Sequence, residues 1–474
     1  MGANESTPQS KEAKIELGEE YSHKSGVYKL WTRVHPCSRN KNNGTLFLKE
    51  FGVVSSASSD LKKYFDNGIT SLRRLRHPCI LQYVDAQFTP GEAQLFTERV
   101  QILDLCIDSQ SPIEIRAGLR SILEALVFLH TTASISHNAV CPSSIFVSPD
   151  GMWRLGGFEF ARNCGQTAAD DHLLLSELFR SVKPAPFSPP EDQQAMRTGQ
   201  PLWARDAYGF GRLIEYSIQY LEGEEDENVL SSLRDAVKRL CASDADERPT
   251  LVQCMDDPAF SNPLSEIENF VRTIQTKNEE EKRIFFDSSL SLLRSLPPRV
   301  VGRRLTRTLL SRYVMLEQRA HERLLCALMK PATSSSTLDD VIVGLLPIDL
   351  YRETVLQECA HVLKVRDAAV RLAIMDHFES FAPHYSKEQL ISNVLPEVLI
   401  GLEDADNRIV AATLKAMSVL VPLMGADIVL GRSPLDKVSS IGGDSRHSSA
   451  NGRQRHRIFA DGTPKASSTI QSLV

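Results

Sequence analysis

Phosphoryl transfer needs a carboxylate base and oxygen ligands for magnesium, and one segment of the chain has the spacing of such a loop without those side chains. The segment HNAVCPSSIFV begins at His137 and follows the H-R-D-L-x-x-x-N pattern. Ala139 occupies the position of the base, and Ser144 that of the magnesium-binding amide. Cys141 stands where a lysine usually helps to hold the transferred phosphate. The framework of a catalytic loop is therefore present without its reactive groups.

A second segment, DGMWRLGGFE from Asp150, resembles the approach to the D-F-G motif of protein kinases, whose Asp holds magnesium. Here Gly157 occupies the Asp position, and Glu159 occupies that of the final Gly. The separation between Ala139 and Gly157 is the one that protein kinases keep between the corresponding positions. Two altered motifs in the expected register are a stronger signal than either one alone. Glu159 is the one carboxylate considered as a substitute ligand.

The groups that would hold ATP phosphates are also incomplete. Lys49 is the best candidate for the strand lysine that contacts the α- and β-phosphates in kinases. The helix residue that would pair with it falls at Gly68, which has no side chain to offer. No G-x-G-x-x-G loop precedes Val27. We therefore expect no metal site and weak or absent ATP binding.

These losses favour a pseudokinase, a kinase fold without kinase activity. The base alone usually contributes about 10²–10⁴-fold to the rate, and the metal ligands are replaced as well. We expect a catalytically inactive scaffold or adaptor. Two alternatives stay open at this point: a nucleotide-binding sensor that does not turn ATP over, and a weak residual Ser/Thr kinase with unusual metal ligands.

Structural signatures of the kinase fold are retained. The sequence PPE ending at Glu191 resembles the A-P-E motif, and Asp206 begins a segment similar to a conserved helix start of kinases. Arg248 lies in ERPT, which resembles a late kinase signature. The resemblance to kinases implies a buried ion pair between Glu191 and Arg248. Removing one member of such a pair costs about 3–5 kcal/mol.

Composition places the chain among ordinary globular proteins. Of its 474 residues 42% are hydrophobic and 24% charged, and the formal net charge is −6, which disfavours nucleic-acid binding. Nine cysteines are scattered without a C-x-x-C pair, so neither a disulfide framework nor a zinc site is expected. No uninterrupted apolar run reaches about 18 residues, and no membrane-spanning helix is expected.

The order of strand and helix patterns predicts an α+β, bilobal, protein-kinase-like domain followed by an all-α HEAT-repeat solenoid. Short apolar runs such as Val27–Trp31 and Leu46–Leu48 predict strands, with a hairpin tip at Arg39–Gly44. Five segments result: a flexible leader at 1–25, an N-lobe at 26–100, a C-lobe at 101–262, HEAT-like repeats at 263–430 and a disordered tail rich in Ser, Gly and basic residues at 431–474.

The solenoid is expected because one stretch of the chain recurs at a constant offset. Five positions from Val370 to Pro383 superpose on five positions from Ile409 to Pro422. HEAT repeats are about 40–47 residues long, so the offset from Val370 to Ile409 lies near their lower limit. A generic helical bundle remains the alternative.

The first six residues, MGANES, match the pattern for N-myristoylation at Gly2. A single myristoyl chain gives a membrane partition constant of only about 10⁴ M⁻¹, so a second contact is needed. The leader offers no net basic charge, and we expect that contact to come from a protein partner.

Together these features resemble the Scy1-like pseudokinases, most of all the ezrin-associating branch. The matching segments are the MGANES start, LRHPC ending at Cys79, TERV ending at Val100, the loop from His137 and EEEK ending at Lys282. The resemblance implies an adaptor in membrane trafficking or in cell adhesion and migration. It also implies protein partners on the C-lobe and HEAT-like surfaces, such as an ezrin-type linker or coat proteins. The expected location is the cytoplasm with a reversible membrane pool, at the Golgi apparatus and at the lamellipodium.

Overall fold

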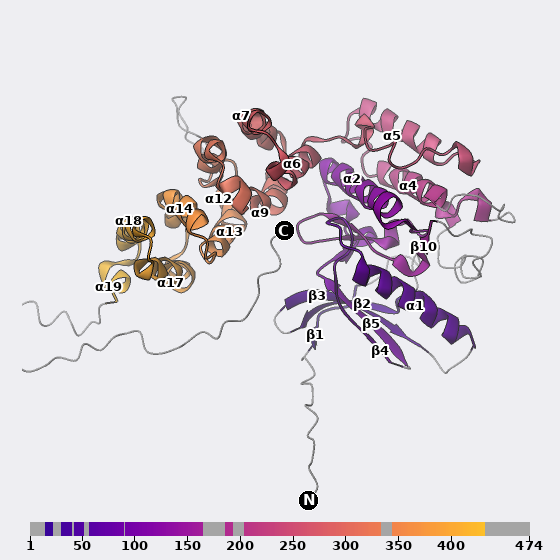
Figure 1. The fold of residues 1–474 in the computed structure, drawn as a ribbon, viewed down its shortest axis with the longest axis horizontal. Coiled ribbons are helices and arrows are strands. Elements are labelled where there is room, and N and C mark those ends of the chain that lie inside the picture. Colours follow the sequence, from indigo (N-terminus) through magenta and orange to yellow (C-terminus); the bar gives the residue numbers. More distant parts are fainter. Residues whose placement is uncertain are drawn as a thin grey trace, which may run out of the picture.

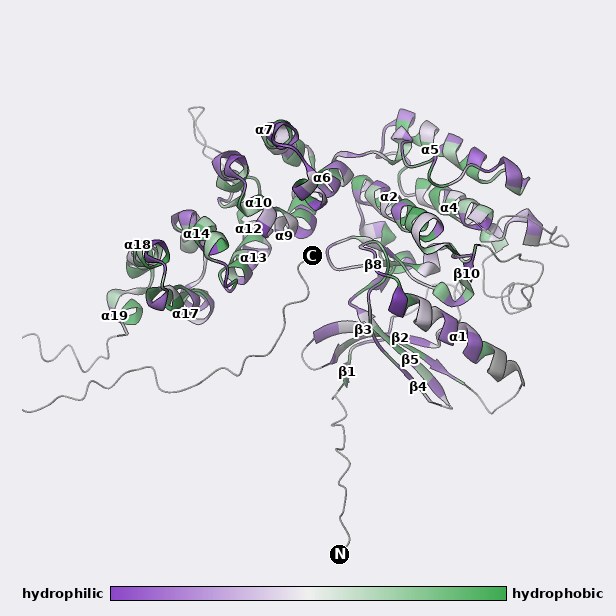
Figure 2. Cartoon of the chain, viewed as in Figure 1, coloured by the Kyte–Doolittle hydropathy of each residue, from purple (hydrophilic) through white to green (hydrophobic). Residues whose placement is uncertain are grey.

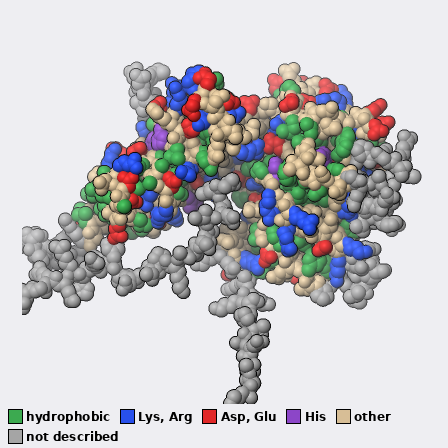
Figure 3. All heavy atoms as spheres, in the orientation of Figure 1, with side chains coloured by type: hydrophobic (Ala, Val, Ile, Leu, Met, Phe, Trp, Pro, Cys, Tyr) green, Lys and Arg blue, Asp and Glu red, His purple; other side chains and the backbone are tan. Residues whose placement is uncertain are grey.

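The computed structural model describes residues 15–21, 30–39, 42–51, 56–89, 91–164, 185–192, 203–332 and 344–431. Gly2 lies outside these ranges, and so does the predicted tail beyond residue 431. Figure 1 shows a strand-rich N-terminal part, followed by helices that extend away from it. Acidic and basic side chains are interspersed over the visible face of both parts (Figure 3).

The N-terminal part begins with a five-stranded antiparallel sheet in the order β1-β2-β3-β5-β4. In the central strand, alternate side chains face opposite sides, as strand geometry requires. Leu46 and Leu48 pack with Cys37 and Phe96 on one face, while Phe47 enters the main core on the other. The strands are β1 (Ile15–Leu17), β2 (Arg33–Arg39), β3 (Asn42–Glu50), β4 (Tyr83–Phe88) and β5 (Glu92–Glu98).

Three expectations for this sheet need correction. β1 lies within the predicted leader, where Leu17 pairs with Cys37 of β2; so short a strand shows no alternation that the sequence could reveal. The strand expected at Val27–Trp31 is also wrong for its described end, since Leu30 and Trp31 are buried in a bend. The predicted hairpin tip is narrower than expected, because β2 and β3 pair up to Arg39 and Asn42.

The rest of the N-terminal part is mainly helical and carries two small sheets. α2 starts with a capping box, in which Ser111 and Glu114 satisfy each other's backbone donors. Gly118 lets α2 approach β9, because a Cβ there would lie within 2.2 Å of the Trp153 ring. The elements are α1 (Ser56–Arg74), α2 (Pro112–Phe128), α4 (Trp203–Ile218), α5 (Glu227–Leu240), β6 (Gln101–Ile102), β7 (Ile135–Ser136), β8 (Ile145–Val147), β9 (Trp153–Leu155) and β10 (Arg162–Asn163).

The second part, here called the helical region, has its own hydrophobic core from Leu264 to Val429. Its helices contain both hydrophobic and hydrophilic residues (Figure 2). The longer helices are α6 (Pro263–Arg272), α7 (Glu279–Ser295), α13 (Val355–Val362), α14 (Ala368–Asp376) and α18 (Asn407–Met424). The shorter ones are α8 (Pro298–Val300), α9 (Thr306–Leu309), α10 (Arg312–Met315), α11 (Cys326–Leu328), α12 (Ile348–Glu353), α15 (Phe378–Phe381), α16 (Lys387–Gln389), α17 (Leu395–Leu399) and α19 (Ala426–Val429).

The constant offset seen in the sequence relates α14 to α18. Asp367 caps the first helix and Asp406 the second, each accepting a hydrogen bond from the backbone two residues on. The two helices contact each other directly. By length and composition α18 could also cross a membrane, although a core helix of a soluble protein can have the same composition.

The two parts share a continuous interface along α2. Ala117 of α2 belongs to the core of the helical region, and Arg272 of α6 forms an ion pair with Glu124 of α2 at 3.1 Å. Arg304 is buried and pairs with Glu268, and it also donates a hydrogen bond to the Gly151 carbonyl at 3.1 Å. Arg304 therefore connects the helical region to the β8–β9 turn.

Candidate functional site

The residues that the sequence places at the catalytic positions are all buried. Ala139, Cys141 and Ser144 are each at most 2% exposed. The Ser144 hydroxyl donates to the Cys141 carbonyl at 2.8 Å and accepts from its backbone N–H at 3.1 Å. This hydroxyl is therefore used within the loop itself.

Asp206 holds the loop that begins at His137 through hydrogen bonds to its backbone. Asp206 is fully buried in α4 and accepts hydrogen bonds from the backbone N–H groups of His137 at 2.7 Å and Asn138 at 2.6 Å. Its carboxylate also contacts His130 at 2.9 Å. Burial alone would raise the pKa of Asp206, but these partners outweigh it and hold the pKa below its usual value. Asp206 therefore fixes the backbone at the start of the loop.

Gly157 lies where a metal-binding Asp would be required. Its backbone is left-handed, with φ +74°, a conformation that glycine adopts without strain. The next residue, Phe158, is fully buried and makes an edge-to-face contact with His137. Over the described residues, no group of three or more His, Cys, Asp or Glu side chains is arranged to hold a metal ion.

Glu159, the candidate substitute ligand, is engaged elsewhere. It is 3% exposed and accepts a hydrogen bond from the Trp31 indole nitrogen at 2.9 Å. Asn67 of α1 donates to the carbonyls of Phe158 and Glu159 at 3.2 and 3.0 Å. Gly68 lies against the same residue, since a Cβ there would be 3.1 Å from Glu159 Cγ. The helix is therefore held on this segment by backbone contacts rather than by a Lys–Glu pair.

Lys49 is on β3, as the sequence predicted, but without the partner that it would need. It forms no ion pair with any residue that the structure describes. Burial lowers the pKa of its ammonium group. A half-buried cation without a carboxylate is poorly held for phosphate binding.

Aromatic side chains fill the space between β3 and the floor of the cleft. Phe47 lies two residues before Lys49, on the same face of β3, and its ring meets Phe146 of β8 edge to face with centroids 5.3 Å apart. Trp31 packs against Phe47 at 5.8 Å and Phe65 at 4.7 Å. Both phenylalanines of the first pair are at most 4% exposed. The sequence alone did not indicate this contact, because the two rings lie far apart in the chain.

At the linker between the lobes, the backbone of Val100 has hydrogen-bond partners within the chain. Thr45 is fully buried, and its hydroxyl accepts a hydrogen bond from the Val100 backbone N–H at 2.9 Å and donates to the Val100 carbonyl at 3.0 Å. Tyr21 donates to the same carbonyl at 3.1 Å. The N–H and the carbonyl of Val100 therefore already have partners within the chain. The base of a bound nucleotide would have to compete with these partners for the same hydrogen bonds.

The implied ion pair between Glu191 and Arg248 is present as a two-point contact. The Arg248 guanidinium donates to the two carboxylate oxygens at 2.7 and 2.8 Å. It donates further to the carbonyls of Ala204 at 3.0 Å and Ala242 at 2.9 Å. Burial alone would raise the pKa of Glu191, but the bonds from Arg248 outweigh it and lower the pKa.

Comparison with known proteins finds several relatives with similar sequences. A mouse protein described as associating with the carboxyl-terminal domain of ezrin is 34% identical over 364 residues, covering 76% of this chain and 49% of the mouse protein. A probable inactive serine/threonine-protein kinase, scy1, of Dictyostelium discoideum is 21% identical over 83% of this chain and 47% of its own length. The human SCY1-like protein 2 is 23% identical over 52% of this chain and 32% of its own length.

The chain thus spans less than half the length of each of these relatives. No protein-family model matches it. Among solved structures, that of Cex1p aligns over 93% of this chain and 79% of its own, with a TM-score of 0.50 and 16% sequence identity. That likeness concerns the fold alone.

Proposed function

Because the chain belongs to the Scy1-like family of protein-kinase-like proteins, we propose that it is a catalytically inactive scaffold that binds other proteins. The family resemblance expected from the sequence is confirmed. The description of the Dictyostelium relative as probably inactive agrees with the prediction that kinase chemistry has been lost. The proposal rests on Ala139, Ser144 and Gly157 standing where a base and two metal ligands would be required.

The contact between Phe47 and Phe146 is the observation that most favours a scaffold over a nucleotide sensor. A nucleotide base would have to separate two buried rings and displace Thr45 from Val100. Separating aromatic rings loses about 0.5–1.5 kcal/mol beyond the area they bury. We therefore propose that ATP is bound weakly or not at all and that no cofactor is used.

Thermal unfolding in the presence of ATP tests this proposal. A ligand at 1,000 times its Kd stabilises the folded state by about 4 kcal/mol, so tight binding is easily detected. We expect no shift in Tm at millimolar ATP, with magnesium or with EDTA. A magnesium-dependent rise of several degrees would contradict the proposal. A rise that is the same in EDTA would favour the nucleotide sensor instead.

For the helical region we propose HEAT-like repeats, stacked as antiparallel helix pairs in a right-handed series. The direct contact between α14 and α18, whose sequences superpose at a constant offset, supports this assignment. The approximate boundaries 26–262 for the kinase-like domain and 263–430 for the repeats are part of the same proposal. An experimental structure in which these helices do not form serial pairs would overturn it.

The partners and the location are proposed from the family. The mouse relative is named for its association with ezrin, and we propose a cytoskeletal linker of that type, or a trafficking coat protein, as a partner of this chain. The roles would lie in membrane trafficking or in cell adhesion and migration. A myristoyl group on Gly2 would supply a reversible membrane contact at the Golgi apparatus or the leading edge.

A further inference from the structure

Three arginines form an exposed row on one face of the helical region. The backbone is helical from Pro298 to Leu309, across α8, a π-type turn and α9. Arg299, Arg303 and Arg307 follow one another at intervals of four residues, and all three are exposed. On a helix, such residues have Cβ atoms about 5–6 Å apart. The row therefore presents regularly spaced cations.

Among the described residues, these arginines have few ion-pair partners. Arg299 and Arg307 make no ion pair with any residue in the part of the chain that the structure describes. Arg303 pairs with Glu353 at 3.2 Å, but both side chains are more than half exposed, at 53% and 58%. Exposed pairs of this kind contribute little to stability, so Arg303 can exchange Glu353 for another carboxylate.

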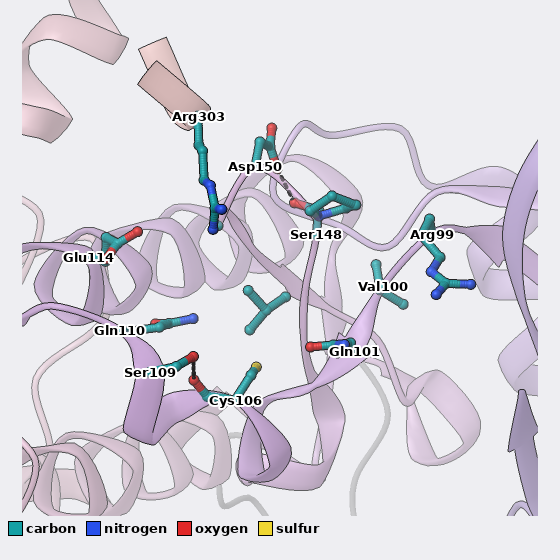
Figure 4. A pocket seen from close by; sticks show the side chains of 13 residues that line it. Arg99, Val100, Gln101, Cys106, Ser109, Gln110, Glu114, Ser148, Asp150 and Arg303 are labelled. Carbon is teal, nitrogen blue, oxygen red and sulfur yellow. Dashed lines mark hydrogen bonds between the residues drawn. The ribbon is translucent and has the colours of Figure 1, made fainter. Parts of the chain in front are cut away.

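The row adjoins a cavity of about 390 Å³ between the helical region and the N-terminal part. Figure 4 shows Arg303 extending toward this space from the helical region, beside Asp150 of the β8–β9 turn. Arg99 and Gln101 of the interlobe linker line another side. Arg99 has no carboxylate partner among the described residues. The cavity thus adds a fourth cation to the row.

The two carboxylates in the cavity wall are already engaged. Glu114 accepts hydrogen bonds from the backbone and hydroxyl of Ser111 at 2.9 and 2.6 Å. Asp150 accepts one from the Ser148 hydroxyl. The hydrogen-bonding capacity that remains for a ligand comes mainly from arginine donors, which favour carboxylates and phosphates.

We propose that Arg299, Arg303 and Arg307, with the cavity that Arg303 lines, bind an extended acidic segment of a partner protein. Alternate residues of an extended chain lie about 6.5 Å apart, which is close to the spacing of the row. Carboxylates at every second position could each meet one guanidinium. The inference deepens the proposed scaffold function, on which it rests, by specifying the chemistry of one partner.

A peptide fits this surface better than a polyphosphate chain. The whole chain has a net charge of −6, and Glu353, Asp150 and Glu114 border the row and cavity. Nucleic-acid affinity depends on neutralising many phosphates, which these carboxylates oppose. The neutral amide of Gln101 suits a peptide backbone, and the Ser109 hydroxyl, which donates to the Cys106 carbonyl at 2.7 Å, can accept from a peptide N–H.

Fluorescence anisotropy with synthetic peptides tests the proposal on the full chain. The probe is a fluorescein-labelled twelve-residue peptide of alternating Glu and Ser; a second peptide has the same composition in two blocks. We expect saturable binding of the alternating peptide, several-fold tighter than of the block peptide. Replacing Arg299, Arg303 and Arg307 together by Gln should weaken it roughly tenfold, since each exposed pair changes affinity only a few-fold.

The matched control replaces Arg319, Arg323 and Arg408 by Gln; these side chains are exposed by 50%, 58% and 75% and carry the same charge. The control should change affinity less than twofold. If the first triple variant does not fold, Arg307→Gln alone should still weaken binding a few-fold. Absence of binding, equal affinity for both peptides, or equal losses in both triple variants would overturn the proposal.

Two further measurements test for other ligands and for kinase activity. Tighter binding of a twelve-nucleotide poly-U RNA, or of vesicles containing phosphoinositides, lost in the same triple variant, would overturn the assignment to a peptide. Phosphorylation of the peptide serines on adding Mg-ATP would instead contradict the proposed inactive scaffold and leave the peptide site standing. Failure of the two proposals is therefore distinguishable.

Discussion

Gly68 of α1 lies directly against Glu159: a Cβ at Gly68 would be 3.1 Å from Glu159 Cγ and 3.2 Å from its backbone nitrogen. In kinases, the residue expected at this position is a carboxylate that pairs with the strand lysine. Here it is a glycine, and α1 packs closely against Glu159 instead. Asn67 strengthens that packing with three hydrogen bonds to backbone carbonyls, at 3.0–3.2 Å. These contacts hold α1 against the segment around Glu159.

Restoring a glutamate at this position should destabilise the protein rather than reactivate it. Gly68→Glu would force α1 away from Glu159 and place two carboxylates together, at a cost of about 1–3 kcal/mol from overpacking. Chemical denaturation measures this change. Gly91→Glu is the matched control, because nothing lies within 4 Å of a Cβ there. An unchanged stability of Gly68→Glu, with gain of ATP binding, would contradict this account of the cleft.

Loss of Arg248 should strongly destabilise the N-terminal part. Arg248→Met leaves the Glu191 carboxylate buried without its partner, which typically costs about 3–5 kcal/mol. Arg239→Met removes a more exposed ion pair with Asp257 and should cost no more than about 1 kcal/mol. Urea unfolding followed by circular dichroism compares the two variants, and equal losses would argue against a structural role for the buried pair.

The same pair predicts a pH dependence with a definite sign. The pKa of Glu191 is lowered in the folded protein, so the folded state favours the ionised carboxylate. Its contribution is present above the ordinary pKa of 4.5 and is lost as pH falls through the lower, folded value. The stability difference between wild type and Glu191→Gln should be largest near neutral pH and should shrink below about pH 4.5. A difference that grows on acidification would refute the assignment.

Two neighbouring arginines should differ sharply in their structural importance. Arg304 is 1% exposed in its side chain and joins Glu268 to the Gly151 carbonyl across the two parts of the chain. Arg304→Ala should lower the free energy of unfolding by about 1–3 kcal/mol, since Glu268 and the Gly151 carbonyl both lose their donor at this interface. Arg303→Ala, at an exposed position, should change it by less than about 1 kcal/mol. Similar effects of both substitutions would contradict the proposed connection.

Gly2→Ala should move the protein from membranes to the cytosol, because the acyl acceptor is lost. One myristoyl chain binds membranes only marginally, and wild type should therefore divide between the two pools. Fractionation of cells that express each form measures this, with mass spectrometry of the N-terminal peptide. An unchanged membrane fraction, or an unmodified Gly2 in wild type, would refute myristoyl anchoring.

The lost catalytic groups could be located from the sequence because they occupy two motifs with a fixed separation. Ala139, Ser144 and Gly157 were identified by position alone, and the pairing of Glu191 with Arg248 followed from resemblance. The structure pairs Glu191 with Arg248 and gives Gly157 a left-handed backbone conformation. Short-range patterns were sufficient wherever the chain keeps kinase spacing.

The closure of the cleft could not be predicted in the same way. Phe47 and Phe146 lie far apart in the sequence, and nothing in either segment specifies their contact. The bonds from Thr45 to Val100 likewise depend on the register of β3 against β5. The three-residue strand β1 is too short to show an alternation that the sequence could reveal. Such features arise from tertiary packing, which local periodicity does not encode.

The most direct test of the central claim is phosphoryl transfer by the purified chain. Radiolabelled ATP with magnesium or manganese should give no phosphate incorporation above that of Lys49→Ala, either into the protein itself or into a general substrate. The sequence places Ala139, Ser144 and Gly157 at the positions of the general base and the metal ligands, so we expect wild type and variant to be indistinguishable. Incorporation by wild type that Lys49→Ala abolishes would contradict the claim.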